Sequence, residues 1–188
     1  MKTDYIEWDM IMHIVRQKRL EKDWPTAYMF MIGAHMGLRW SDLSQLKIKD
    51  FYEKEVNMIE QKTSKRRTIP VHPAVRRFID ETRIENGYKM DDYIFRIKRH
   101  NRPMFKQQMT RLLKLVSIEY NLPGNIATHS LRKSFGRRIW DLSKSDETIL
   151  MLSEIFNHTD PAVTRKYLGL RKEEINSVYM SLTPIDNE

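Results

Sequence analysis

Four places in this sequence hold side chains that could do chemistry together. An arginine follows a Gly-Leu pair that ends an apolar stretch, and a lysine lies in a basic segment between two strand-like runs. A histidine and an arginine, three residues apart, share one helix face, and a second histidine precedes a tyrosine by nine residues. The six side chains are those of Arg39, Lys62, His129, Arg132, His158 and Tyr167.

Each of these residues also has an ordinary structural interpretation when it is taken alone. Arg39 could form a surface ion pair with Asp42, three residues further on. Lys62 could simply be solvated in a basic turn, and Tyr167 could pack its ring at the edge of a core. A His-x-x-Arg pair arises often by chance. Only the complete set points to a shared chemistry.

That chemistry is direct attack on a phosphodiester, which builds negative charge on non-bridging oxygens of a five-coordinate transition state. Arg39 and Arg132 offer planar, forked donors for such oxygens. Preorganised donors of this kind are worth about 3–4 kcal/mol each. A tyrosine hydroxyl, with a reference pKa of about 10, is only about 0.1% ionised at pH 7. Two guanidiniums would favour the phenolate of Tyr167, and His129 can accept or relay its proton.

The elements that must position these groups are mostly helices. Apolar residues at helical spacing predict a helix over residues 4–21, with Asp4 as its cap, and Trp24-Pro25 begins a second, buried helix. A short helix is expected in LRWSDLSQLKIKDF, after Gly37. Further helices are predicted over residues 73–86, 104–120, 129–142, 146–157, 161–168 and 171–181.

The β structure is expected to be small. EVNMIEQ and RTIPV, separated by the basic KTSKR, predict an antiparallel hairpin, whereas residues 88–105 are predicted to be a basic loop. Asp160-Pro161 supplies a helix cap and a first helical position, which places Tyr167 about two turns along that helix. The predicted fold class is mainly α with a small antiparallel β-hairpin, an α+β fold in one domain.

Composition points to a basic protein with a polyanionic partner. The 188 residues carry 33 Lys+Arg against 25 Asp+Glu, a formal charge of +8, and suit one compact domain. Charge alone does not separate nucleic acid from an anionic membrane. The chain has no run near the ~20 apolar residues of a membrane span and no signal-peptide stretch at its start, so a cytosolic protein is expected.

Several cofactor classes are excluded. With no cysteine, the chain has no disulfides, no thiol catalysis and no cysteine-ligated zinc. Its histidines lack the close pairing of a zinc site, and no Gly-rich phosphate-binding loop is present. We therefore expect no metal and no ATP, because a covalent phosphotyrosine would itself conserve the energy of the cleaved bond.

Taken in order, the motifs GLRWSDL, QKTSKRRTIP, HSLRKSF and NHTDPAVTRKY resemble those of the catalytic domain of the tyrosine recombinase, or phage integrase, family. The resemblance runs from about residue 20 to about residue 170. Two small departures are Asn157, where glycine is usual, and Gly136, in place of a commoner small residue.

This resemblance implies site-specific DNA cleavage and rejoining through a 3′-phosphotyrosine. Tyr167 would be the nucleophile, Lys62 the general acid for the leaving 5′-oxygen, and His158 a hydrogen-bonding partner of the phosphate. A mobile-element integrase in a prokaryotic or phage setting, cytoplasmic and nucleoid-associated, is the expectation. Its partners would be double-stranded DNA and further copies of itself, a tetramer on DNA and a monomer when free, with no membrane.

The same resemblance sets the expected domain organisation. Residues 1–170 would be the catalytic domain, and residues 171–188 a C-terminal helix and tail. The apolar positions of that helix would either pack into a neighbouring protomer or pack on their own domain. The N-terminal DNA-clamping domain typical of the family, on the order of 100 residues, has no room before Arg39. We expect the catalytic portion of a longer recombinase, with a naturally short member as the alternative.

Basic clusters around the motifs are predicted to contact DNA phosphates, which gives affinity without sequence information. Their members are Lys65, Arg66, Arg67, Arg96, Lys98, Arg99, Arg137 and Arg138.

Two rival functions stay open at this point. One is a DNA-binding regulator that keeps the fold without the chemistry, although such a protein could lose Tyr167 without penalty. The other is DNA relaxation of the type IB topoisomerase kind, although the motif spacing and the small size fit an integrase better.

Overall fold

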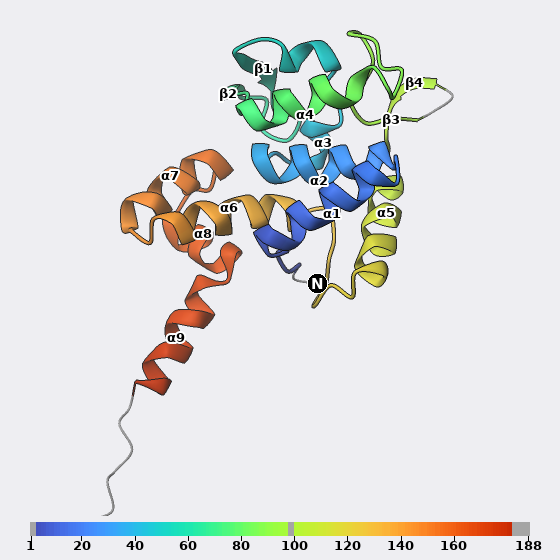
Figure 1. Ribbon diagram of the computed structural model, residues 1–188. Coiled ribbons are helices and arrows are strands. Elements are labelled where there is room, and N and C mark those ends of the chain that lie inside the picture. Colours follow the sequence, from blue (N-terminus) through green and yellow to red (C-terminus); the bar gives the residue numbers. More distant parts are fainter. Residues whose placement is uncertain (1–2, 98–99, 182–188) are drawn as a thin grey trace, which may run out of the picture. The chain divides into compact units, whose positions relative to one another are not determined.

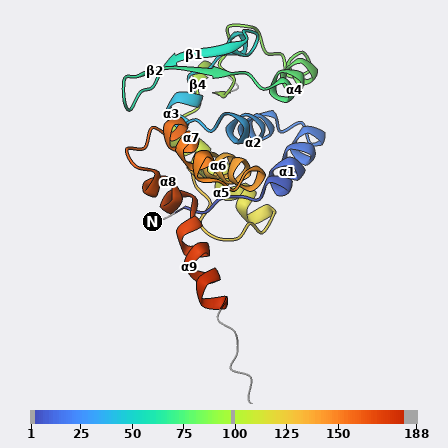
Figure 2. The same ribbon diagram turned by 90° about the vertical axis from the view of Figure 1, so that its left-hand side faces the viewer.

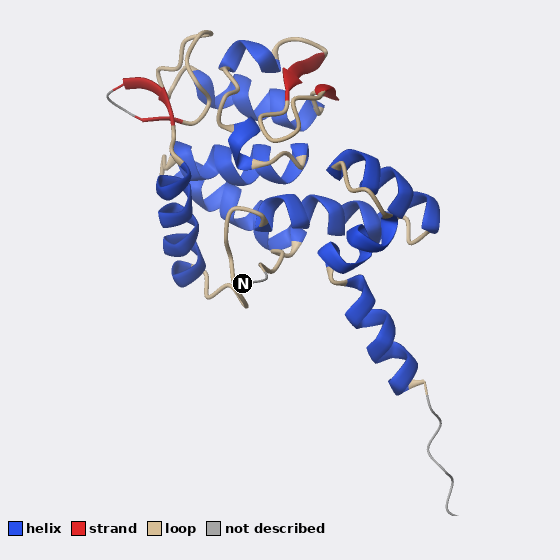
Figure 3. Ribbon diagram, turned by 180° about the vertical axis from the view of Figure 1, so that it is seen from behind, coloured by secondary structure: helices blue, strands red, loops and turns tan. Residues whose placement is uncertain are grey.

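The structure is a computed structural model that describes residues 3–97 and 100–181. Helices dominate, accompanied by two short pairs of antiparallel strands (Figure 3). The predicted fold class is therefore confirmed. The chain forms two compact units, residues 1–135 and residues 136–188, and the boundary lies inside helix α6 (Ser130–Leu142).

The first unit, residues 1–135, contains most of the elements. In chain order they are α1 (Trp8–Leu20), α2 (Trp24–Met36), α3 (Trp40–Leu43), the 3-10 helix η1 (Ile48–Phe51), β1 (Glu55–Ile59), β2 (Arg66–Pro70), α4 (Pro73–Arg83), β3 (Arg96–Ile97), β4 (His100–Pro103), α5 (Lys106–Glu119) and the start of α6.

Helix α2 forms the centre of the first unit. It begins as predicted at Trp24-Pro25, and the Asp23 side chain accepts a hydrogen bond from the Thr26 N–H at its N-terminus. Its sequence is apolar on every side, and both α1 and α4 pack against it (Figure 1). Tyr28 and Phe30 are fully buried. Because α2 is enclosed, the chain leaving its C-terminus is held in a fixed place, and Arg39 lies on that segment.

The first helix starts later than predicted, and Asp4 is not its cap. Helix α1 begins at Trp8, after Glu7. The Asp4 carboxylate instead accepts the Asn125 N–H at 2.8 Å, while the Asp4 N–H donates to the Asn125 carbonyl at 2.9 Å. This pairing ties the N-terminal segment to the loop after α5, so Asp4 is not available to cap a helix.

The predicted hairpin is confirmed. Strands β1 and β2 pair antiparallel, from Glu55 opposite Pro70 to Ile59 opposite Arg66 (Figure 2). The turn between them spans residues 60–65, with Lys62 inside it. Two differences from prediction accompany it: β3 and β4 form a second strand pair within the predicted loop, and the single helix expected after Gly37 is divided into α3 and η1.

Both differences have a local cause. Strands β3 and β4 are two and four residues long, too short for an alternating pattern to show in the sequence. The helix after Gly37 is interrupted because Lys47 is extended and bridges to Tyr93, and the Ile48 N–H donates to the Asp92 carbonyl at 2.9 Å. In both cases, contacts between segments distant in sequence decide the local structure.

The second unit, residues 136–188, contains the rest of α6 together with α7 (Asp146–Phe156), α8 (Pro161–Leu168) and α9 (Leu170–Met180). Asp160 accepts from the Ala162 N–H at 2.7 Å, which confirms the predicted cap of α8. A Cβ at Gly136 would lie 2.7 Å from Leu168 and 2.8 Å from Phe156, so glycine lets α6 approach the core of this unit. None of the helices in residues 3–97 and 100–181 has both the length and the apolar character needed to cross a membrane.

Candidate active site

Arg39 is positioned by the end of α2. Gly37 ends that helix with φ of 58°, in the left-handed region, and a Cβ there would lie 2.5 Å from the Phe135 ring. Glycine is therefore needed both for its backbone conformation and for the close approach of Phe135. Arg39 follows as the extended residue before α3, with a side chain that is 15% exposed.

Arg132 meets the same glycine from α6. Arg132 is buried, at 3% exposure, and its Nη1 donates to the Gly37 carbonyl at 2.8 Å. The structure therefore places Arg132 against the backbone two residues before Arg39. Helices α2 and α6 therefore bring Arg39 and Arg132 into the same region, although these residues are 93 positions apart in the sequence (132 − 39).

His129 lies at the N-terminus of α6, one residue before its first helical position, and is exposed. Its carbonyl accepts the Lys133 N–H at 2.9 Å, in the first helical hydrogen bond. Partial desolvation of the imidazole, together with the positive charges of Arg132, Lys106 and Arg39, lowers the pKa of His129. At neutral pH the imidazole is therefore mainly neutral, and the positive charges of both arginines contribute to keeping it so.

Lys62 is exposed in the β1–β2 turn, and this turn is fastened to α3. The Gln61 N–H donates to Asp42 Oδ1 at 2.9 Å, and Asp42 is fully buried. A surface ion pair between Arg39 and Asp42, the ordinary alternative for Arg39, therefore does not describe this region. Instead, Asp42 accepts a hydrogen bond from the turn that carries Lys62, so this turn is attached to α3, directly after Arg39.

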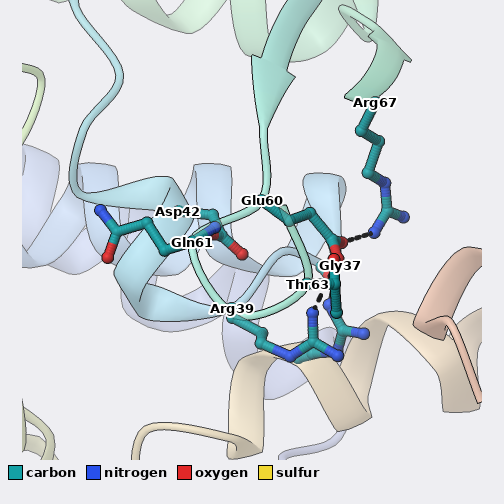
Figure 4. Close-up of polar contacts among 8 residues, drawn as sticks. Gly37, Arg39, Asp42, Glu60, Gln61, Thr63 and Arg67 are labelled. Carbon is teal, nitrogen blue, oxygen red and sulfur yellow. Dashed lines mark hydrogen bonds and ion pairs between the residues drawn. The ribbon is translucent and has the colours of Figure 1, made fainter. Parts of the chain in front are cut away.

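Sequence reasoning missed Glu60, which lies between two arginines (Figure 4). Its carboxylate is 3.2 Å from Arg39 Nη1 and 2.6 Å from Arg67 Nη1, and it also accepts from the Thr63 hydroxyl at 2.7 Å. Burial works to raise the pKa of Glu60, but the hydrogen bonds of Thr63 and Arg67 and the charge of Arg39 hold it below its usual value. The only sequence signal was an acid at the end of a strand-like run, next to a basic turn.

The second unit brings His158 and Tyr167 together. The ring centroids lie 5.4 Å apart at 75°, and His158 Nδ1 is 2.8 Å from the hydroxyl of buried Thr164. Asn157 ends α7 with φ of 53°, in the left-handed region. Asparagine tolerates this conformation better than most residues, which explains how it can stand where the family usually has glycine.

Among the predicted DNA-contacting residues, Lys65 and Arg66 are exposed at the hairpin turn and Arg138 is partly exposed. Lys98 and Arg99 lie outside the described residues. All of these assignments stay predictions.

Three further candidates are held by acidic side chains. Arg67 contacts Glu60, as described above. Arg96 donates to Asp92 at 2.7 Å and lies 4.2 Å above the Tyr88 ring, and Arg137 donates to Glu173 at 2.9 Å. Each of these arginines has a structural role, whatever its role toward DNA.

The predicted site residues thus form two groups. Arg39, His129 and Arg132 cluster in the first unit, with the turn of Lys62 fastened beside Arg39. His158 and Tyr167 are in contact in the second unit. The first group has the charge and donors for a phosphate, and the second has a phenol beside an imidazole. Within residues 3–97 and 100–181, no cluster of three or more His, Asp or Glu side chains could hold a metal ion.

Comparison with known proteins identifies the family of this chain. Residues 4–174 match the phage integrase family, and the chain belongs to that family. It is a tyrosine recombinase.

One relative, the probable integrase/recombinase YoeC of Bacillus subtilis, is 30% identical over 166 residues, which cover 88% of both chains. The integrase of Escherichia phage P2 is 28% identical, and the match covers 79% of this chain and 39% of that one. Tyrosine recombinase XerD of Staphylococcus haemolyticus is 25% identical, and the match covers 79% of this chain and 51% of XerD.

Solved structures show the same fold. XerA recombinase aligns with a TM-score of 0.72 at 18% identity, over 98% of this chain and 66% of XerA. A lambda integrase dimer bound to a core site aligns with a TM-score of 0.67 at 16% identity, over 100% of this chain and 52% of that one. The fold built by α2, the hairpin and α6 is therefore the tyrosine recombinase catalytic fold.

Proposed function

We propose that this protein cleaves and rejoins DNA strands at specific sites through a 3′-phosphotyrosine, as the integrase of a mobile element. The observation that carries the proposal is the hydrogen bond from Arg132 to the Gly37 carbonyl, two residues before Arg39, together with a His129 imidazole on which the charges of both arginines act. Relatives named as integrases, from a phage and from Bacillus subtilis, support the mobile-element assignment.

Binding of the scissile phosphate is assigned to the two arginines. Each guanidinium can donate two parallel hydrogen bonds to phosphate oxygens, and both carry a full positive charge. Because Arg132 is held by the Gly37 carbonyl before DNA arrives, little reorganisation is needed as charge builds up in the transition state.

Cleavage then forms one bond to phosphorus, breaks another and transfers two protons. Tyr167 Oη attacks phosphorus and gives its proton to neutral His129, while the bond from phosphorus to the 5′-oxygen breaks. Lys62 protonates that oxygen, and His158 hydrogen-bonds the phosphate. The product is a phosphotyrosine and a free 5′-hydroxyl. Attack on the phosphotyrosine by the 5′-hydroxyl of a second strand runs these steps in reverse and rejoins the DNA.

DNA binding and assembly follow from this role. The protein binds double-stranded DNA, is a monomer when free and forms a tetramer on DNA, in the cytoplasm and associated with the nucleoid. Structures of a transposon integrase with transposon-end DNA and of a lambda integrase dimer on a core site support the DNA partner. Exposed apolar residues on α9, Ile175, Val178 and Tyr179, support exchange of that helix between protomers.

A nicked suicide DNA substrate tests the proposal. When the 5′-hydroxyl product diffuses away, the covalent adduct accumulates and is seen as a shifted band after denaturation. We expect an adduct with the wild type and with Tyr179→Phe, whose tyrosine is 71% exposed on α9, and none with Tyr167→Phe.

The products separate the rival functions. Exchanged strands support recombination, and relaxation of supercoiled DNA without exchange would assign a topoisomerase activity instead. DNA binding with no adduct from the wild type would refute the enzyme and leave a DNA-binding regulator.

A further inference from the structure

Glu60 is a buried carboxylate shared by two guanidiniums. It is 2% exposed, with Oε2 3.2 Å from Arg39 Nη1 and Oε1 2.6 Å from Arg67 Nη1 (Figure 4). Oε2 also accepts from the Thr63 hydroxyl at 2.7 Å. A buried carboxylate is strongly unfavourable unless it is paired and hydrogen-bonded, and here both oxygens are used. Its position is therefore closely determined by these contacts.

The backbone of the same residue closes the turn that carries Lys62. The Glu60 N–H donates to the Lys65 carbonyl at 3.0 Å, and the Glu60 carbonyl accepts the Ser64 N–H at 2.8 Å. The next residue, Gln61, donates its N–H to Asp42 in α3. The turn is thus joined to the Arg39 region twice, through the Glu60 side chain and through the Gln61 backbone.

We infer that Glu60 is a positioning residue for DNA cleavage, which holds Arg39 in place relative to the Lys62 turn and makes Arg67 a further cation of the phosphate site. The inference rests on the proposed function. Two guanidiniums and one carboxylate leave one net positive charge, so the site still attracts a phosphate. Fixing Arg39 before DNA binds lowers the entropic cost of reaching the reactive geometry.

Three variants separate positioning from charge. Glu60→Gln keeps the shape and removes the charge, and Glu60→Asp keeps the charge. Glu55→Gln is the matched control, because Glu55 is exposed on β1, the strand that leads into the turn, and its change removes the same charge. The measurements are the single-turnover rate of adduct formation at saturating nicked DNA and, separately, the affinity for that DNA.

We expect Glu60→Gln to slow adduct formation by about tenfold to a hundredfold, as misplaced groups do. Its DNA affinity should be equal to or tighter than that of the wild type, because a negative charge is removed. Glu60→Asp should recover part of the rate, and Glu55→Gln should react at the wild-type rate. A purely structural role would lower rate and affinity together and would overturn the inference, as would a wild-type rate in Glu60→Gln.

A second measurement does not depend on activity. In arginine side-chain NMR spectra of the DNA-free protein, we expect slowed rotation of the Arg39 and Arg67 guanidiniums in the wild type and faster rotation in Glu60→Gln. If the wild type forms no adduct, the proposed function fails. If the Arg39 and Arg67 guanidiniums rotate equally fast in the wild type and in Glu60→Gln, the contact of Glu60 with these arginines is contradicted, whatever the activity. Arg67→Lys keeps the charges of residues 60 and 67 but loses the forked donor, so it should also slow adduct formation. This variant tests the same inference if Glu60→Gln does not fold.

Discussion

At the residue scale, the environment of His129 determines how cleavage should depend on pH. A proton acceptor must be neutral at the working pH, and an unperturbed histidine titrates at about pH 6.5. Partial desolvation and the charges of Arg132, Lys106 and Arg39 lower the pKa of His129, so its neutral form persists to more acidic pH. The arginines that we propose to bind the phosphate would thereby also keep the imidazole of His129, the proposed base, neutral.

We therefore predict that the acidic decline in the single-turnover rate of adduct formation is centred below about pH 6.5, the value for an unperturbed histidine. His129→Asn should lower the rate and remove this acidic decline. His13→Asn, at an exposed histidine on α1, is the control and should leave the profile unchanged. If the acidic decline of the wild-type rate were centred well above pH 6.5, the assignment of His129 as the base would be contradicted.

At the scale of elements, Gly37 connects α2, α3 and α6. Its left-handed backbone ends α2, its carbonyl holds Arg132, and its missing Cβ admits Phe135. This position therefore combines a backbone requirement with a packing requirement. Gly169, between α8 and α9, has the backbone requirement alone, since its φ is 85° and no atom lies within 4 Å of an added Cβ.

We predict that Gly169→Ala lowers the free energy of unfolding by ~1–2 kcal/mol, the cost of a left-handed conformation. Gly37→Ala should lower it by a further ~1–3 kcal/mol, because the added methyl overlaps the Phe135 ring. Urea unfolding of the two variants measures the difference. Equal losses in both would show that the Phe135 contact is readily relieved.

At the scale of the whole molecule, α9 is held near its start by contacts within its own unit and exposes apolar side chains toward its end. Its first residue, Leu170, is buried, and Glu173 and Glu174 pair with Arg137 and Arg165. Toward its end, Val178 is 66% exposed. A helix fixed at one end and apolar at the other is suited to pack against a second copy of the protein.

We predict that Val178→Asp weakens assembly on DNA while monomer folding and the affinity of a single DNA-bound protomer change little. Asn176→Asp, an exposed polar position on the same helix with the same added charge, is the control. Analytical ultracentrifugation of the protein–DNA complexes measures the assembly. Normal assembly by Val178→Asp would rule out α9 exchange through this residue.

The amino-acid sequence alone predicted the helices with strong periodicity, the hairpin and the six candidate catalytic residues. These features depend on local rules: apolar spacing, Pro and Asp at helix starts, and motif residues within short segments. The family match over residues 4–174 confirms the family that these motifs suggested.

Tertiary structure decided what depends on contacts between distant segments. Asp4 pairs with Asn125 instead of capping a helix, Lys47 bridges to Tyr93 and interrupts the helix after Gly37, and Glu60 reaches Arg39 across 21 positions (60 − 39). The physical reason is the same in each case. A polar group in a folded chain takes whichever partner the packing of the surrounding elements brings within hydrogen-bonding distance, and no local pattern in the sequence encodes that choice.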